Sequence, residues 1–216
     1  MNQRRATVRG LFARIRPRQQ ADPPAEAESA QVEVPELDAF ARRIDFSKLS
    51  TKQFVQLLDA LDMLGKTGAG FELSTMRTET FVWIISQAST EQLDALMAKP
   101  NLRHVVFSEI FRRMSDHVRP ESGTNEQVVV HWRFSGGTGD DGFDRFQTVI
   151  DKGSCKSTMI QDLDPRATLT LTPVDFLKVA TGNVNATLLF VKGRVKVRGD
   201  IPFAAKFADY FDLPHP

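Results

Sequence analysis

The chain has 216 residues, 41% of them hydrophobic, and a formal net charge of +1 at pH 7, which gives no global electrostatic case for binding nucleic acid. Its length allows one large or two small domains, and its single cysteine excludes an internal disulfide and favours a reducing compartment. Because no apolar run reaches the ~18 residues of a membrane span, and no secretory or peroxisomal signal is visible, we expect a cytoplasmic protein.

The first 35 residues read as a basic tail followed by a Pro/Ala/Glu-rich linker. Residues 1–20 contain arginines and no acidic residue: Arg4, Arg5, Arg9, Arg14, Arg16 and Arg18. The polar composition is typical of a disordered tail. Four apolar residues nevertheless fall at helical spacing, namely Val8, Leu11, Phe12 and Ile15. Arginines around such a face also suit a weak anchor on an anionic membrane surface, so both readings stay open.

Residues 36–118 are predicted to form an all-helical region. Ser50 with Gln53, and Ser89 with Gln92, match the capping-box pattern that opens a helix. Further helices are expected over about 75–88 and 102–118. The last of these carries an apolar stripe of Phe107, Ile110, Phe111, Met114 and Val118. We expect this stripe to form core, since the region shows no residues arranged for chemistry.

After residue 125 the pattern changes to alternation with a period of two, which predicts strands. A Gly-rich turn over 135–142 separates the first two of them. The expected strands are 128–134, 143–151, 154–161 and 167–172, and the apolar run Thr187–Lys192 is expected to be a central strand.

Two helices are predicted in the last fifty residues. Thr172 is a suitable N-cap, Pro173 suits the first helical position, and Gly182 suits the position after the helix. Gly193 is expected to turn the chain into a hairpin, and Pro202 to begin a final helix whose inner face is aromatic.

A sequence of small motifs runs from Thr168 to Phe211. A helix with an Asp-Phe pair ends in Thr-Gly, a Phe-x-x-Gly-basic segment follows, and alternating basic and aliphatic residues lead through Gly-Asp into an Ala-rich helix. The motif residues are Asp175, Phe176, Thr181, Gly182, Phe190, Gly193, Arg194, Lys196, Val197, Gly199, Asp200, Ala204, Ala205 and Phe207. This pattern resembles the sterol carrier protein type two superfamily of small lipid-transfer domains. The match is weaker over 126–167, and the helices at 75–118 look similar to leaders of bacterial members.

The resemblance implies an α+β fold, in which a five-stranded, mostly antiparallel sheet is covered by helices and preceded by an all-helical region. It implies an apolar tunnel between sheet and C-terminal helices that binds fatty acid, acyl-CoA, phospholipid or a sterol-like lipid without covalent chemistry. The expected divisions are 1–35 for tail and linker, 36–118 for the helical region and 119–216 for the sterol-carrier-like domain. The loop over 183–186 departs from the family's pattern.

The candidate ligand-binding residues are apolar side chains of the sheet and the two C-terminal helices. The sheet supplies Trp132, Phe146, Met159, Leu169, Leu171 and Phe190, and the helices supply Phe176, Leu177, Phe203, Phe207 and Phe211. The chain has 16 Phe against 2 Trp and 1 Tyr, and Phe has no polar group that needs a partner. Such residues form either a dense core or a dry cavity, and spacing alone leaves both open.

No catalytic residue, cofactor or metal is expected. The Gly-rich turn lacks the Lys-Ser/Thr helix of a phosphate loop. The acidic residues beside it lack the closing Glu of an EF-hand, and the histidines lack metal-ligand spacing. Cys155 is more typical of a packed thiol than of a reactive one.

Two hypotheses follow. The first is a non-enzymatic lipid-binding or lipid-transfer protein, whose basic N-terminus contacts anionic membrane. The second is a protein-interaction scaffold with a filled core, whose helical N-terminal region binds a partner. The oligomeric state stays open.

Overall fold

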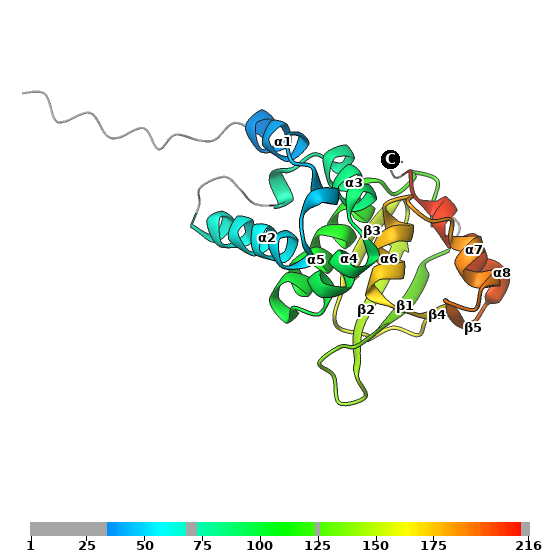
Figure 1. Ribbon diagram of the computed structural model, residues 1–216. Coiled ribbons are helices and arrows are strands. Elements are labelled where there is room, and N and C mark those ends of the chain that lie inside the picture. The colour runs from blue at the N-terminus through cyan, green and yellow to red at the C-terminus, as the bar shows by residue number, and fades with distance from the viewer. Residues whose placement is uncertain (1–33, 68–72, 124–125, 213–216) are drawn as a thin grey trace, which may run out of the picture. The chain divides into compact units, whose positions relative to one another are not determined.

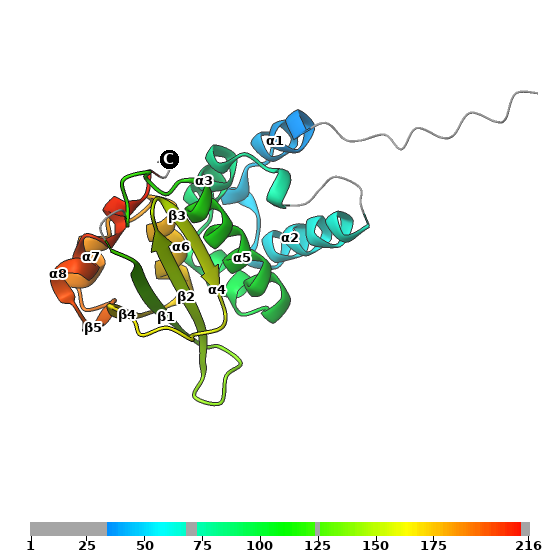
Figure 2. The same cartoon turned by 180° about the vertical axis from the view of Figure 1, so that it is seen from behind.

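A five-stranded sheet with helices on one face forms the part of the chain that this computed structural model describes, residues 34–67, 73–123 and 126–212 (Figures 1 and 2). The strands are β1 (Val128–Ser135), β2 (Phe143–Asp151), β3 (Ser154–Thr158), β4 (Ala167–Leu171) and β5 (Lys196–Gly199). Their order is β3-β2-β1-β4-β5. Only the central β1–β4 pair is parallel among these strands. The predicted α+β class, with a mostly antiparallel sheet after a helical region, is confirmed.

Within the described residues, five helices and two 3₁₀ turns precede the sheet. They are α1 (Val34–Arg42), η1 (Phe46–Lys48), α2 (Thr51–Lys66), η2 (Leu73–Thr75), α3 (Thr78–Gln87), α4 (Thr90–Met97) and α5 (Pro100–Asp116). The remaining ones are α6 (Pro173–Ala180), α7 (Ala186–Val191), α8 (Ile201–Ala205) and η3 (Phe207–Tyr210). Both predicted capping boxes, at Ser50 and at Ser89, are present. Residues 1–33 of the predicted basic tail and linker lie outside the described residues.

The prediction of a central strand over Thr187–Lys192 is wrong, because all of these residues except Lys192 lie in helix α7, and Lys192 is the C-cap of that helix. The Asn185 side chain accepts hydrogen bonds from the N–H groups of Thr187 and Leu188, which caps the helix. Gly193 has φ +68 and ends α7, so it does not turn a hairpin. A short apolar run fits a buried strand and a packed helix equally well, and here the cap at Asn185 favours the helix.

Two boundaries also differ from the predictions. The third strand ends at Thr158 rather than at residue 161, and the Thr158 side chain instead bonds the Ile160 carbonyl at 2.9 Å. The final helix is divided into α8 and η3, with Lys206 between them in a non-helical conformation.

Aromatic rings from α5, α6 and the inner face of the sheet form one continuous core. The Phe107 ring stacks on Phe134 at 4.4 Å between centroids, and the Phe111 ring lies 4.9 Å from Phe146. Phe176 of α6 lies 5.2 Å from Phe111 on the other side. The aromatic stripe of α5 therefore forms core, as the sequence predicted. This core lies directly against the inner face of the sheet.

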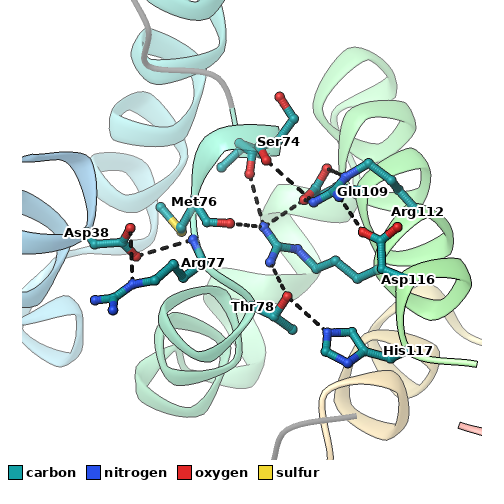
Figure 3. A network of polar contacts seen from close by, with 11 residues as sticks. Asp38, Ser74, Met76, Arg77, Thr78, Glu109, Arg112, Asp116 and His117 are labelled. Atoms are coloured by element: carbon teal, nitrogen blue, oxygen red, sulfur yellow. Dashed lines mark hydrogen bonds and ion pairs between the residues drawn. The ribbon is translucent and has the colours of Figure 1, made fainter. Parts of the chain in front are cut away.

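Hydrogen bonds from a buried arginine tie α5 to the start of α3 and the segment before it (Figure 3). Arg113, whose side chain is 3% exposed, pairs with Glu109 at 2.7 Å. Its guanidinium also donates to the carbonyls of Leu73 and Met76 and to the Thr78 hydroxyl. Burial lowers the pKa of Arg113, and Glu109 opposes that shift. Glu109 compensates the charge of this buried arginine, and both of its terminal nitrogens are hydrogen-bonded, although its Nε has no partner. The arginine therefore ties the chain around α3 to α5.

A second ion pair ties α5 to the sheet. Arg103 pairs with Asp144 of β2 at 2.6 Å, and donates to the carbonyls of Phe134 and Ser135 at the end of β1. Because α5 joins both the N-terminal helices and the sheet, its contacts cross the boundary predicted at residue 119. That boundary stays a prediction.

Candidate functional site

An apolar cavity of about 90 Å³ lies between the inner face of the sheet and helices α6, α7 and α8. The residues around it are all apolar: Met114, Trp132, Leu169, Leu171, Phe176, Val179, Ala180, Ala186, Phe190, Val195, Val197, Ala204, Ala205, Phe207, Ala208 and Phe211. The one polar atom among these side chains, Trp132 Nε1, donates to Thr148 Oγ1 at 2.8 Å. The wall therefore offers a ligand hydrophobic contact and no side-chain charge.

The floor and one wall of the cavity come from regular secondary structure. Trp132, Leu169 and Val197 face it from the adjacent strands β1, β4 and β5, where the pairing places Trp132 opposite Leu169 and Leu169 opposite Val197. Helix α6 follows β4 directly, because Thr172 caps it through the Asp175 N–H and Pro173 occupies the first turn. That cap brings Phe176 over the strands.

The covering side consists of short elements. Asp200 caps α8 by accepting from the Phe203 N–H at 2.9 Å, and it also pairs with Arg166 at 2.9 Å. These two contacts lower the pKa of the Asp200 carboxyl, and the hydrogen bond from the Phe203 N–H has the larger effect. Gly199 before it has φ +97, and a Cβ there would lie 2.5 Å from the Arg166 carbonyl oxygen. The Gly-Asp pair thus marks a close approach of strands and the start of α8.

The cavity reaches the surface beside α8 and η3. Ala205 and Ala208 line it and are exposed, whereas Phe207 between them is 4% exposed and lies against Trp132 at 5.7 Å. Phe190 of α7 forms another part of this edge and is half-buried. The mouth is thus bounded by α7 and by the α8–η3 segment.

The structure brings seven of the eleven predicted ligand-binding residues to this cavity. They are Trp132, Leu169, Leu171, Phe176, Phe190, Phe207 and Phe211. Phe190 reaches it from a helix, not from the strand that the sequence suggested. Whether these residues contact a ligand stays a prediction.

The other four predicted residues lie elsewhere. Phe146 packs in the aromatic core against Phe107 and Phe111, and Leu177 is fully buried away from the cavity. Met159 is 55% exposed after the end of β3. Phe203 packs on Phe207 and Tyr210 without lining the cavity.

Nine lining residues were not predicted, and more than half of them are alanines. They are Met114, Val179, Ala180, Ala186, Val195, Val197, Ala204, Ala205 and Ala208. Val195 and Val197 were visible as one face of an alternating strand. The alanines had no such signal, because a small side chain leaves space only when larger ones surround it.

One buried charge lies close to the cavity wall without entering it. Asp175, 1% exposed, pairs with Arg194 at 2.6 Å. The sequence marks Arg194 only as the basic residue of the Phe-x-x-Gly-basic segment, which contains no sign that it compensates a buried carboxylate.

The described ranges were also compared with the features of a metal site, a reactive thiol and a membrane-spanning helix. They contain no cluster of three His, Cys, Asp or Glu side chains that could hold a metal ion. Burial raises the pKa of the Cys155 thiol to about 11, with the Ser115 hydroxyl opposing the shift. No helix in this part of the chain is long and apolar enough to cross a membrane.

Sequence comparison supports the resemblance drawn from the motifs. Residues 138–212 match the family model described as the SCP-2 sterol transfer family. The C-terminal part of this chain is therefore similar to an SCP2 domain over these residues. A relative, Sterol carrier protein 2 from Arabidopsis thaliana, is 27% identical over 110 residues, which are 49% of this chain and 89% of the relative. Lipid binding or transfer is therefore the class of function that the family match supports.

Solved structures show likeness at low identity. Palmitated SCP2L2 from Aedes aegypti is 17% identical over 51% of this chain and 95% of its own, with a TM-score of 0.39. The sec-alkylsulfatase Pisa1 from Pseudomonas sp. is 12% identical over 82% of this chain, with a TM-score of 0.42. The match covers 32% of the sulfatase, so this chain spans about a third of that enzyme's length.

Proposed function

We propose that the SCP2-like domain binds the acyl chain of a lipid, without covalent chemistry, in the cavity between the sheet and helices α6 to α8. The observation that carries this proposal is the wholly apolar wall, whose single polar atom, Trp132 Nε1, is already bonded to Thr148. Each methylene transferred from water into such a wall contributes about 0.8 kcal/mol. No side chain of the wall is suited to act as nucleophile, acid or base, which supports carriage rather than catalysis.

The volume favours a flexible chain over a rigid ring system. A cavity of roughly 150 Å³ accommodates benzene, so the 90 Å³ here has room for about three or four carbon atoms. This is below the roughly 300–1,000 Å³ of pockets that enclose a drug-sized ligand. An acyl chain enters progressively while the wall moves, whereas a sterol nucleus requires the full volume at once.

Helices α7 and α8 are the elements suited to such movement. They span six and five residues, and η3 spans four. Short helices gain little stability from their own hydrogen bonds and depend on packing. We infer that a ligand replaces the contact that Phe207 now makes with Trp132 and packs against Phe190.

Two measurements test the proposal. Mass spectrometry of lipid extracted from natively purified protein is expected to find an acyl lipid, and a fluorescent fatty acid is expected to bind in the absence of vesicles. Phe190→Asp should abolish that binding, because it places a carboxylate in the apolar wall. Leu188→Asp is the matched control, since Leu188 lies on the same helix, is 47% exposed and does not line the cavity. Absence of both lipid and binding would make the interaction scaffold the better account.

A cytoplasmic location, in line with the single free cysteine, is part of this proposal. Membrane contact by the arginine-rich N-terminus also stays a proposal, because those residues lie outside the described part of the chain.

A further inference from the structure

Polar side chains cover one half of the outer face of the sheet, which is the face turned away from helix α6 (Figure 2). Trp132 and Leu169 point to the cavity on the inner face, so their neighbours along β1 and β4 point outward. The outward residues form two rows across the strands. The first row consists of Arg145, Arg133, Thr170 and Lys196, and the second of Gln147, His131, Thr168 and Arg198.

The two rows have an excess of positive charge. Lys196 and Arg198 are exposed, and neither makes an ion pair with another residue of the described ranges. Arg133 and Arg145 both donate to the same oxygen of Asp141, at 2.9 and 2.5 Å. Four cations are therefore accompanied by a single carboxylate, in a chain whose net charge is only +1.

The other acidic residues nearby lie outside the two rows. Asp140 belongs to the turn between β1 and β2, and Asp162 and Asp164 belong to the connection from β3 to β4. That connection covers the other half of the outer face, where Gln147 is 3% exposed and donates to Asp162 at 2.7 Å. Within the described residues, no segment covers the cationic half in this way.

The chemistry of the rows favours an acidic protein segment over other anionic partners. They carry no exposed apolar side chain that could insert among lipid headgroups. The one aromatic ring beside them, Phe143, is covered by the Arg133 guanidinium at 4.3 Å and is not open for stacking with a base. Thr168 and Thr170, half-buried between the cations, offer hydroxyl groups that can bond to a peptide backbone.

We propose that an extended acidic segment of a partner protein docks on the cationic half of the outer face, formed by Arg133, Arg145, Thr168, Thr170, Lys196 and Arg198. Lys196 and Arg198 are two positions apart on one strand, which separates them by about 7 Å, and carboxylates at alternate positions of an extended chain recur at the same interval. Arg133 lies two strands from Lys196, about 10 Å away and within reach of the same segment. Because this face is opposite to the cavity, the proposal does not depend on the proposed function.

The test is fluorescence anisotropy of a labelled peptide of alternating glutamate and threonine, titrated with the full chain at low salt, beside a lysine–threonine peptide of the same length. We expect only the acidic peptide to bind, and an affinity at least about tenfold lower for Lys196→Glu combined with Arg198→Glu. Lys52→Glu combined with Lys99→Glu makes the same change in net charge at two exposed lysines elsewhere, and should alter the affinity by less than about twofold. Arg145→Gln, on strand β2, should also weaken binding and serves if the β5 variant fails to fold.

Three outcomes would overturn the proposal. The first is no binding of the acidic peptide, and the second is an equal loss of affinity in the two double variants, which would show a response to net charge alone. The third is tighter binding of duplex DNA, or of vesicles containing phosphatidylglycerol, that is lost in the β5 double variant, which would assign this face to nucleic acid or membrane. The fatty acid assay keeps the two proposals apart, since the β5 double variant should bind fatty acid as the unaltered protein does.

Discussion

Filling the cavity from within should raise stability and weaken lipid binding together. Ala180 lines the cavity from the end of α6 and is half-buried, and Ala180→Leu adds three carbon atoms there. The cavity of about 90 Å³ has room for about that many. Ala60→Leu makes the same change at an exposed position of α2 and serves as the control.

The expected magnitudes come from the cavity. Three buried carbon groups at about 0.8 kcal/mol each, less about 0.5–1 kcal/mol for fixing the leucine rotamer, give a gain of about 1.5–2 kcal/mol. The cost of leaving 90 Å³ empty, at about 24 cal/mol per Å³, is about 2 kcal/mol and agrees. This corresponds to a rise in melting temperature of about 5 °C. A ligand that loses three methylene contacts should bind about 50-fold more weakly.

Thermal unfolding and fluorescent fatty acid titration measure the two effects on the same protein. A stabilised Ala180→Leu protein that binds fatty acid with unchanged affinity would show that the ligand occupies another site. A loss of more than about 1 kcal/mol of stability would show that the space is not available to a side chain, and Ala204→Leu then tests the same cavity from α8. Ala60→Leu should change neither quantity.

Three further predictions concern the frame around the cavity. Phe111→Ala should lower the free energy of unfolding by about 3–5 kcal/mol in urea, whereas Phe40→Ala, at a side chain 45% exposed, should change it by less than about 1 kcal/mol. Arg103→Ala should cost about 3–5 kcal/mol by leaving Asp144 unpaired, and joint replacement by Met and Leu should recover most of that loss; no recovery would contradict a charge-pair origin. The pKa of about 11 for Cys155 predicts alkylation at pH 8 about 100-fold slower in the native than in the urea-unfolded protein, and equal rates would contradict it. This thiol's contribution to stability should be complete below about pH 9 and lost as the pH rises toward 11.

Local signals predicted much of the fold. The capping boxes at Ser50 and Ser89, and the Thr172 cap, each depend on contacts within three residues, so the sequence contains the whole interaction. The alternating pattern from Val128 to Phe134 correctly predicted strand β1, because this pattern too depends only on neighbouring positions in the sequence. The prediction for the α7 segment failed because its apolar pattern fits both a strand and a helix. The side-chain oxygen of Asn185, which accepts from the N–H groups of Thr187 and Leu188, distinguishes the two.

The site was predictable only in part, because a cavity depends on packing between distant segments. Phe146 and Phe176 both point to the inner side of the sheet, but α5 fills the space beside Phe146 with Phe107 and Phe111. Over the β4–β5 side the covering residues include Ala180 and Ala204, which leave room. The spacing of residues along one strand does not show which side chains a helix some thirty residues away packs against that strand.

The position of Trp132 gives this protein a built-in optical reporter. The chain has two tryptophans, and Trp83 lies far along the chain in α3, beneath the Arg42 guanidinium at 4.6 Å. With Trp83 replaced by phenylalanine, all indole emission arises from a ring in the cavity wall whose N–H bond to Thr148 fixes its orientation. Occupancy of the cavity then becomes readable from intrinsic emission or from quenching by a brominated acyl chain, in real time and without a label.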